Sequence, residues 1–327
     1  MFSKTHVKLL PFLILLASLF FIPKMTTSSV QAAKSQTYDG GQSLGSVTEP
    51  IRSSAIHKSE DTELSMVVLP TSFSGSDLNT RRPEDWKSWN IVPSLSQRAL
   101  LIYNQGLTIG NNPHAFSKVG DGEISAEWFL TEFDLGVEHY DLGPNIDLQT
   151  TVTYFSGSFG RQSQAARRGF NAQRVLDPSL ADRKLCQTGE SPLDCEIRIH
   201  RPSFALVSLG TNQVWQPAEF ESGMRKIIET LMVHGVVPVL STKADNLEGD
   251  NSINMIIARL AVEYDLPVWN FWLAVQPLPN HGLQKDHEHL TYFPNTFSSP
   301  QTMQFAWPVR NLSALQVLKS LLEDTQP

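Results

Sequence analysis

The spacing of apolar residues divides the chain into segments of different kinds. An uninterrupted apolar run covers 9–22, a stretch without periodicity follows it, and ordered patterns begin near Trp86. From there, short apolar runs alternate with stretches in which apolar residues recur every three or four positions. The runs are typical of strands that are covered on both faces, and the longer spacing is typical of amphipathic helices.

This alternation predicts a sheet between two layers of helices. The expected strands lie at 115–119, 150–155, 204–209, 236–240 and 267–270, and the expected helices at 124–133, 220–232, 253–264 and 311–322. Strands that alternate with helices are joined by right-handed crossovers, so the predicted fold class is α/β: a three-layer α/β/α sandwich with a mainly parallel, flavodoxin-like sheet. Such sheets bind ligands at the carboxyl ends of their strands.

Residues 1–32 have the three parts of a secretory signal peptide. Lys4 and Lys8 precede the apolar run, and the small residues Val30 and Ala32 mark the expected cleavage site. The 14 residues of this run span about 21 Å as a helix, which is short of the roughly 30 Å hydrocarbon core. The sequence therefore predicts a secreted or extracytoplasmic protein. The alternative is an uncleaved N-terminal anchor, through which alone the chain would contact a membrane.

Two further segments follow the expected signal peptide. Residues 33–85 are rich in Ser and Thr and lack apolar periodicity, which predicts a flexible leader. Residues 86–327 form the expected folded domain. A wall-associated structural protein is a further function class, which only the composition of the leader favours.

The charge balance bears on possible partners. The 327 residues include 26 basic and 33 acidic side chains, a net charge of −7. Removal of residues 1–32 leaves 23 basic residues against 33 acidic ones, or −10. An acidic protein does not neutralise phosphates, so we expect no nucleic-acid partner.

The two cysteines are too few for a disulfide scaffold. Cys186 and Cys195 flank a loop of eight residues. In an exported protein, this arrangement favours a local disulfide over a reactive thiol.

Three of the expected loops after strands carry polar residues suited to acyl transfer. Asp121 lies in the first loop, Asn212 in the second, and Asp286 and His289 in a later one. An aspartate three residues before a histidine can bond Nδ1 of the ring, which leaves Nε2 as a base. The amide of Asn212 can donate a hydrogen bond to a developing oxyanion.

In this order, the motifs resemble those of the SGNH, or GDSL-like, hydrolases over residues 116–322. The matching segments are 119–121, 168–171, 208–212 and 286–291, although Gln213 stands where the family usually has aspartate. The resemblance implies that His289 is the base, that Asp286 orients it, and that Gly169 and Asn212 hold the oxyanion. It also implies a substrate-binding role for Asp121. The implied substrate is an O-acyl ester of a carbohydrate or lipid, either a small molecule or a polysaccharide, and no cofactor is implied.

The departure from the family pattern lies at its nucleophile. Gly122 occupies the position of the family's serine, and glycine has no side chain that could attack an ester. Three alternatives stay open. In the first, the nucleophile is a nearby hydroxyl, either that of Ser125, at an expected helix N-terminus, or that of Ser117. In the second, His289 activates a water in the space that Gly122 leaves. In the third, the protein binds a ligand without hydrolysing it.

Several other residues have two interpretations. Lys243, with Asp245 and Glu248, lines the substrate cleft or lies in a solvated loop that caps the next helix. The aromatic residues of 269–272 form core or stack on a sugar. Asn311 begins a short glycosylation sequon. The histidines around His289 lack a second ligand cluster of zinc type, so no metal is expected.

Overall fold

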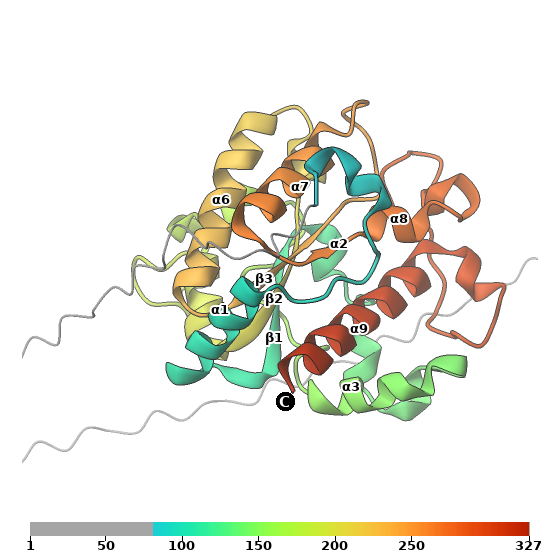
Figure 1. Cartoon of the computed structure of the whole chain (residues 1–327), viewed down its shortest axis with the longest axis horizontal. Helices are drawn as coiled ribbons and strands as arrows, with labels where there is room; N and C mark the ends of the chain where they lie inside the picture. The colour runs from blue at the N-terminus through green and yellow to red at the C-terminus, as the bar shows by residue number, and fades with distance from the viewer. Residues whose placement is uncertain (1–80, 327) are drawn as a thin grey trace, which may run out of the picture. The chain divides into compact units, whose positions relative to one another are not determined.

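The computed structural model describes residues 81–326, which belong to one compact unit (Figure 1). The predicted signal peptide (1–32) and most of the predicted leader (33–85) lie outside the described residues. The helices and strands are α1 Gln97–Thr108, β1 Asn112–Gly120, α2 Gly122–Ser125, α3 Gln149–Tyr154, α4 Ala172–Val175, α5 Pro192–His200, β2 Pro202–Ser208, α6 Pro217–Val233, β3 Val237–Ser241, α7 Ser252–Tyr264, β4 Val268–Trp269, α8 Phe271–Val275 and α9 Ala306–Thr325. Short 3-10 helices are η1 Pro83–Ser88, η2 Thr131–Asp134, η3 Val137–His139, η4 Gly143–Leu148, η5 Pro178–Leu180, η6 Thr211–Gln213, η7 Pro279–Gly282 and η8 Thr302–Gln304.

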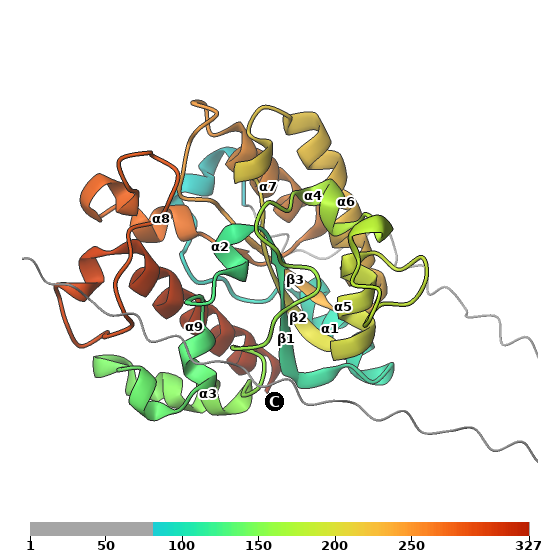
Figure 2. The same cartoon turned by 180° about the vertical axis from the view of Figure 1, so that it is seen from behind.

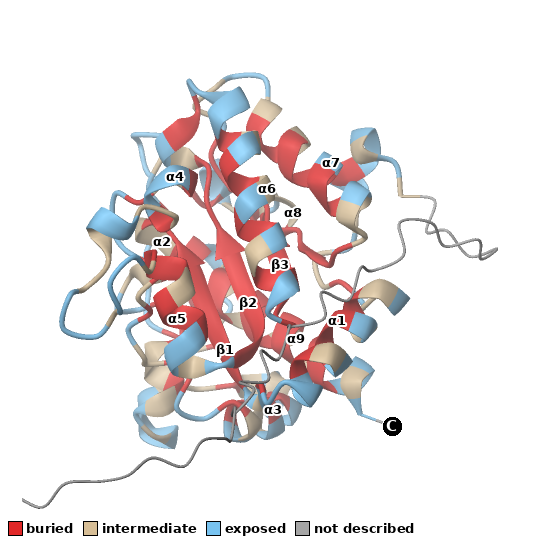
Figure 3. Cartoon of the chain, turned by 90° about the vertical axis from the view of Figure 1, so that its left-hand side faces the viewer, coloured by how far each residue is buried: buried red, intermediate tan, exposed pale blue. Residues whose placement is uncertain are grey.

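The sheet is parallel and has the order β1-β2-β3-β4. Its register pairs Gly120 with Ser208 and Ser241 with Trp269. Every residue of β2 and β3 is buried, and Figure 3 shows the strands as the buried centre of the fold. Burial on both faces explains why these strands are nearly continuous apolar runs.

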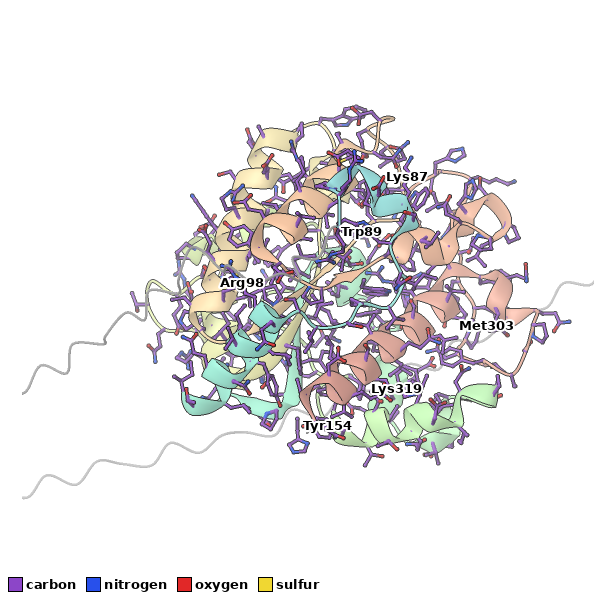
Figure 4. All side chains as sticks on the ribbon, viewed as in Figure 1. Lys87, Trp89, Arg98, Tyr154, Met303 and Lys319 are labelled. Carbon is purple, nitrogen blue, oxygen red and sulfur yellow. A yellow bond between two sulfur atoms is a disulfide. The ribbon has the colours of Figure 1, made fainter. Side chains whose placement is uncertain are left out.

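Helices cover both faces of this sheet, which confirms the predicted three-layer fold class. Figures 1 and 2 show α9 on one side of the strands and α6 on the other, with α5 on the side of α6 in Figure 2. On the first side, Phe204 of β2 stacks on Tyr103 of α1 and meets Phe155 beside α3 edge-on. Lys319 of α9, labelled in Figure 4, forms an ion pair with Asp147 of η4.

A single parallel bridge extends the sheet beyond β1. Gly120 pairs with Ser208 on one side and with Ala166 on the other. With the segment around Ala166 counted as a second strand, the order along the sheet becomes 2-1-3-4-5, the flavodoxin-like order. Gly120 permits this close approach, because a Cβ at this position would lie 1.9 Å from the Ser208 carbonyl oxygen.

Most predicted elements are confirmed, and two are wrong. Residues 150–154 of the expected second strand belong to α3, and the buried residues Thr151 and Val152 of this helix are followed by the buried Phe155 at its C-cap. The helix expected at 124–133 is only the short α2, because the backbone leaves helical geometry at Ala126 and is left-handed at Leu130. The sequence pattern did not predict the helices α1 and α5.

The described fold begins earlier than the expected boundary at residue 86. Arg81 donates to the carbonyl of Leu266 (3.0 Å) and stacks over the ring of Trp89, which Figure 4 labels. These contacts attach the residues before Trp86 to the domain. Among the described residues, no helix is both long enough and apolar enough to cross a membrane.

Two local predictions from sequence have opposite outcomes. Cys186 and Cys195 form a disulfide, as expected. The sequon at Asn311 is not accessible, because this side chain is buried in α9 and bonds the backbone of Leu130 and Trp128.

Replacement of Cys186 and Cys195 by serine is expected to lower the free energy of unfolding by about 2–3 kcal/mol, because the cross-link restricts the unfolded chain. Urea unfolding of both proteins measures the difference. The wild type in reducing buffer should unfold like the variant. Equal urea midpoints for the oxidised wild type and the variant would contradict this expectation.

Candidate active site

The order of the strands reverses at β1, which pairs with β2 on one side and with Ala166 on the other. Chain connections leave β1 towards Ala166 on one side and later return to β2 on the other. Such a reversal of strand order is where open α/β sheets bind ligands, at the carboxyl ends of the strands. The loops that begin at Asp121 and Gly210 both start at this point.

The first loop turns directly from β1 into α2. Asp121 caps this short helix by accepting a hydrogen bond from the backbone of Glu123 (3.1 Å). Gly122 is the first residue of α2, and a Cβ added there would meet only Cγ of Arg168, at 3.8 Å. The nucleophile position is therefore open space, large enough for a side chain.

Burial perturbs the carboxyl of Asp121. The residue is 5% exposed, and burial, together with the nearby charge of Glu123, raises the pKa of Asp121 to about 7. Asp121 is thus a buried carboxyl that caps the N-terminus of α2. Its predicted substrate-binding role stays a prediction.

Replacement of Asp121 by asparagine is expected to change how stability depends on pH. A carboxyl whose pKa rises from 3.8 to about 7 on folding stabilises the fold fully below about pH 4, and this contribution is lost as the pH rises towards 7. Asparagine caps helices equally well and does not titrate. The free energy of unfolding of the variant minus that of the wild type should increase between pH 4 and pH 7, and the total increase should approach about 4 kcal/mol. Urea unfolding across this range measures it; parallel curves for the two proteins would refute it.

An ion pair between Glu123 and Arg310, which no sequence pattern predicted, lies beside Gly122. Glu123 is 18% exposed, and its Oε2 lies 3.6 Å from Nη1 of Arg310, a fully buried residue of α9. Nη2 of Arg310 donates to Ser208 Oγ (2.9 Å) at the end of β2. Four aromatic rings surround the guanidinium: Phe129, Trp269, Phe271 and Trp307. Trp269 and Phe271 are therefore core residues, as the simpler interpretation of 269–272 predicted.

The two expected oxyanion donors lie in adjoining segments. Asn212 Nδ2 donates to the carbonyl of Phe170 (2.8 Å), the residue after Gly169. This bond uses one of the two amide hydrogens of Asn212. Gly169 has a φ of 79°, and its N–H donates to no acceptor among the described residues. One amide hydrogen and one backbone N–H are thus left for a ligand.

Gln213 has a structural role at the position where the related motif usually has aspartate. Its Oε1 accepts from the backbone of Ala172 (2.8 Å), and its amide donates to Gln173. These bonds tie η6 to α4, next to Gly169 and Phe170. Gln213 therefore holds the two donor segments together.

The late loop brings the predicted acid and base together. Nδ1 of His289 lies 2.8 Å from Asp286 Oδ2, while Asp286 Oδ1 accepts from the backbone of Glu288 and His289. These hydrogen bonds lower the pKa of Asp286 to about 2. The side chain of His289 is 60% exposed, and its Nε2 bonds to no described residue. The pair thus has the orientation in which Nε2 serves as the base.

Thr291 attaches this loop to the start of α9. Its hydroxyl accepts from the backbone of Ala306 (2.9 Å), and its carbonyl accepts from the backbone of Trp307 (3.0 Å). Since Arg310 lies one turn further along α9, the same helix carries the His289 loop and the partner of Glu123. The charges of Lys243 and His289 lower the pKa of Glu123, and the charge of Asp245 raises it.

The alternative hydroxyl nucleophiles do not meet His289. Ser125 is the last residue of α2, and not at its N-terminus as expected, so the helix dipole does not favour an alkoxide there. Ser117 is buried inside β1 and donates to Glu196 (2.6 Å). Neither serine bonds His289.

Lys243 is buried, and the alternative of a solvated loop is wrong. Its side chain is 3% exposed, and Nζ donates to both Asp245 and Glu248 at 2.6 Å and to the Asp245 carbonyl at 2.9 Å. Asn254 of α7 bonds the backbone of Lys243 in both directions. All three ammonium hydrogens are used, so a direct substrate contact would have to replace one of these bonds.

No family model matches the chain, and no curated protein matches it. Similar solved structures include a psychrotrophic esterase from Pseudoalteromonas sp., with 14% identity over 64% of this chain and 99% of that one, at a TM-score of 0.40. A GDSL-like lipase from Bacteroides thetaiotaomicron shares 13% identity, with coverage of 68% and 98% and a TM-score of 0.39. An acetylxylan esterase from Geobacillus stearothermophilus shares 12%, with coverage of 64% and 94% and a TM-score of 0.40.

Proposed function

We propose that this chain hydrolyses an O-acyl ester of a small molecule or polysaccharide, with water as the direct nucleophile. The observation that carries the proposal is the Asp286–His289 pair, joined at 2.8 Å with Nε2 of the histidine unengaged by described residues. The open space at Gly122 supports water as the nucleophile, because no described hydroxyl meets His289.

Each step assigns a task to a residue of the site. The ester carbonyl oxygen accepts hydrogen bonds from Asn212 Nδ2 and the Gly169 N–H, which stabilise its charge in the tetrahedral intermediate. Water attacks the acyl carbon, and His289 Nε2 takes the proton. When the C–O bond breaks, the imidazolium returns this proton to the departing alkoxide.

Asp286 supports the histidine through both of these steps. Its depressed pKa, about 2, keeps the carboxylate ionised over the neutral range. An ionised Asp286 fixes the tautomer of His289 and stabilises the imidazolium that forms.

We also propose that the protein works outside the cytoplasm. The signal-like segment at 1–32 and the disulfide between Cys186 and Cys195 support this location, since disulfides persist in oxidising compartments.

The test is the hydrolysis of p-nitrophenyl acetate and butyrate by the purified chain and its His289→Ala variant. The proposal expects turnover that depends on His289. Turnover that is unchanged in the variant overturns it, and so does ester binding without hydrolysis.

A further inference from the structure

We propose that Glu123 is a further catalytic residue, which accepts a hydrogen bond from the attacking water while His289 removes its other proton. This inference rests on the proposed hydrolysis. It gives the site a second carboxylate in addition to that of Asp286. This carboxylate follows the position where the serine nucleophile is missing.

Glu123 lies next to the position of the missing nucleophile. It directly follows Gly122, whose missing side chain leaves the space for water. The backbone N–H of Glu123 donates to the capping side chain of Asp121. The carboxylate of Glu123 accepts no hydrogen bond from a described residue. At 18% exposure, the carboxylate is neither fully buried in the core nor free in solvent.

Glu123 has a partner of opposite charge that is held in place, Arg310. Arg310 is fully buried, and its guanidinium is held by Ser208 and by the faces of the surrounding aromatic rings. Nε and Nη1 of Arg310 have no hydrogen-bond partner among the described residues. A buried, incompletely bonded guanidinium beside a carboxylate favours the ionised form of that carboxylate and limits its movement.

Burial and nearby charges shift the pKa of Glu123 in opposite directions. The pKa of Glu123 is lowered by the charges of Arg310, Lys243 and His289 and raised by the charge of Asp245. The charge of Glu123 in turn raises the pKa of Asp121. Burial raises the pKa of Glu123, and the charge of Arg310 opposes this. A carboxylate in a partly dry site is a stronger hydrogen-bond acceptor than one in water.

The chemistry is balanced without another reactant. One hydrogen of the water bonds a carboxylate oxygen of Glu123, and the other passes to His289 Nε2 as the oxygen attacks the acyl carbon. The tetrahedral intermediate expels the alkoxide, which takes the proton from His289. Glu123 begins and ends the cycle ionised.

The test compares Glu123→Gln with Glu127→Gln, an exposed glutamate of the same segment that serves as the control. We expect Glu123→Gln to lower kcat for p-nitrophenyl acetate about 10^2-fold, with KM nearly unchanged. The urea midpoint should fall, because the substitution leaves the buried charge of Arg310 without its carboxylate partner. kcat is therefore compared in the absence of urea, where circular dichroism shows that both variants are folded. Wild-type kcat in the Glu123→Gln variant overturns the inference.

A second measurement separates catalysis from structure. In a Gly122→Ser background, the first acyl transfer would use the serine hydroxyl and not water. We therefore expect the initial burst of p-nitrophenol to be nearly the same with and without Glu123→Gln. In the Gly122→Ser protein, Glu123→Gln could reduce the burst by the same factor by which it reduces kcat in the protein that keeps Gly122. That result would make Glu123 a structural residue and overturn the inference.

The two proposals fail in different ways. If His289→Ala abolishes turnover and Glu123→Gln does not, the role of Glu123 is refuted and the hydrolase stands. If neither change affects turnover, the proposed hydrolysis itself is refuted.

Discussion

Replacement of His289 by alanine is expected to lower kcat/KM for p-nitrophenyl acetate about 10^2- to 10^4-fold, the usual contribution of a general base. The ring is the only group of the described residues that bonds Asp286 through a side chain, and its Nε2 is available to a water. Without the ring, the proton of the attacking water has no acceptor held by Asp286. The loss should appear in kcat, because the ring binds the reacting water and not the rest of the ester.

A neighbouring histidine provides the matched control. His287 lies two residues away, with a left-handed φ of 59°. Asparagine tolerates this conformation, so His287→Asn removes an imidazole from the same loop with little strain. We expect it to retain the wild-type rate. Equal losses in both variants would mean that the loop has been disturbed, and would remove the support for His289 as the base.

Replacement of Gly122 by serine is expected to create a covalent ester hydrolase. A Cβ at this position meets only Arg168 Cγ, at 3.8 Å, and Gly122 does not have a left-handed φ. The serine hydroxyl would therefore occupy the space now open at the start of α2. A positioned nucleophile avoids the entropic cost of holding a water, so we expect turnover to rise at least about tenfold.

Covalent chemistry identifies this variant independently of its rate. The Gly122→Ser protein should be labelled by an organophosphonate and show a burst of p-nitrophenol, and the wild type should show neither. Gly122→Ala is the control, since it fills the same space without a hydroxyl and should stay unlabelled. A folded, unlabelled serine variant would show that position 122 does not face the reactive centre.

Local patterns predicted the regular elements well where burial is uniform. The strands at 204–209 and 236–240 and the helices at 220–232 and 253–264 correspond to β2, β3, α6 and α7. The pattern failed at 150–155, where β-branched residues favour a strand by propensity. Packing of this segment against β1, β2 and α9 makes it α3, because tertiary contacts outweigh such weak preferences.

The candidate site was predictable only in part for a related reason. Asp286 and His289 lie three residues apart, so their contact is a local property of one loop. Glu123 and Arg310 are far apart in the chain and meet only because α9 packs beside the end of β1. No spacing rule connects such residues. The sole signal for Glu123 was its place next to Gly122.

The sequence by itself determined the α/β order of elements, the Asp286–His289 spacing, the disulfide pair and the missing serine at Gly122, since each depends on neighbouring residues or on periodicity. Only the tertiary structure decided that Lys243 is buried and fully bonded, that Ser125 stands at the wrong end of α2, and that Arg310 lies beside Glu123. The physical reason is that burial and charge depend on which distant segments pack together, and these packing contacts are set by the whole core.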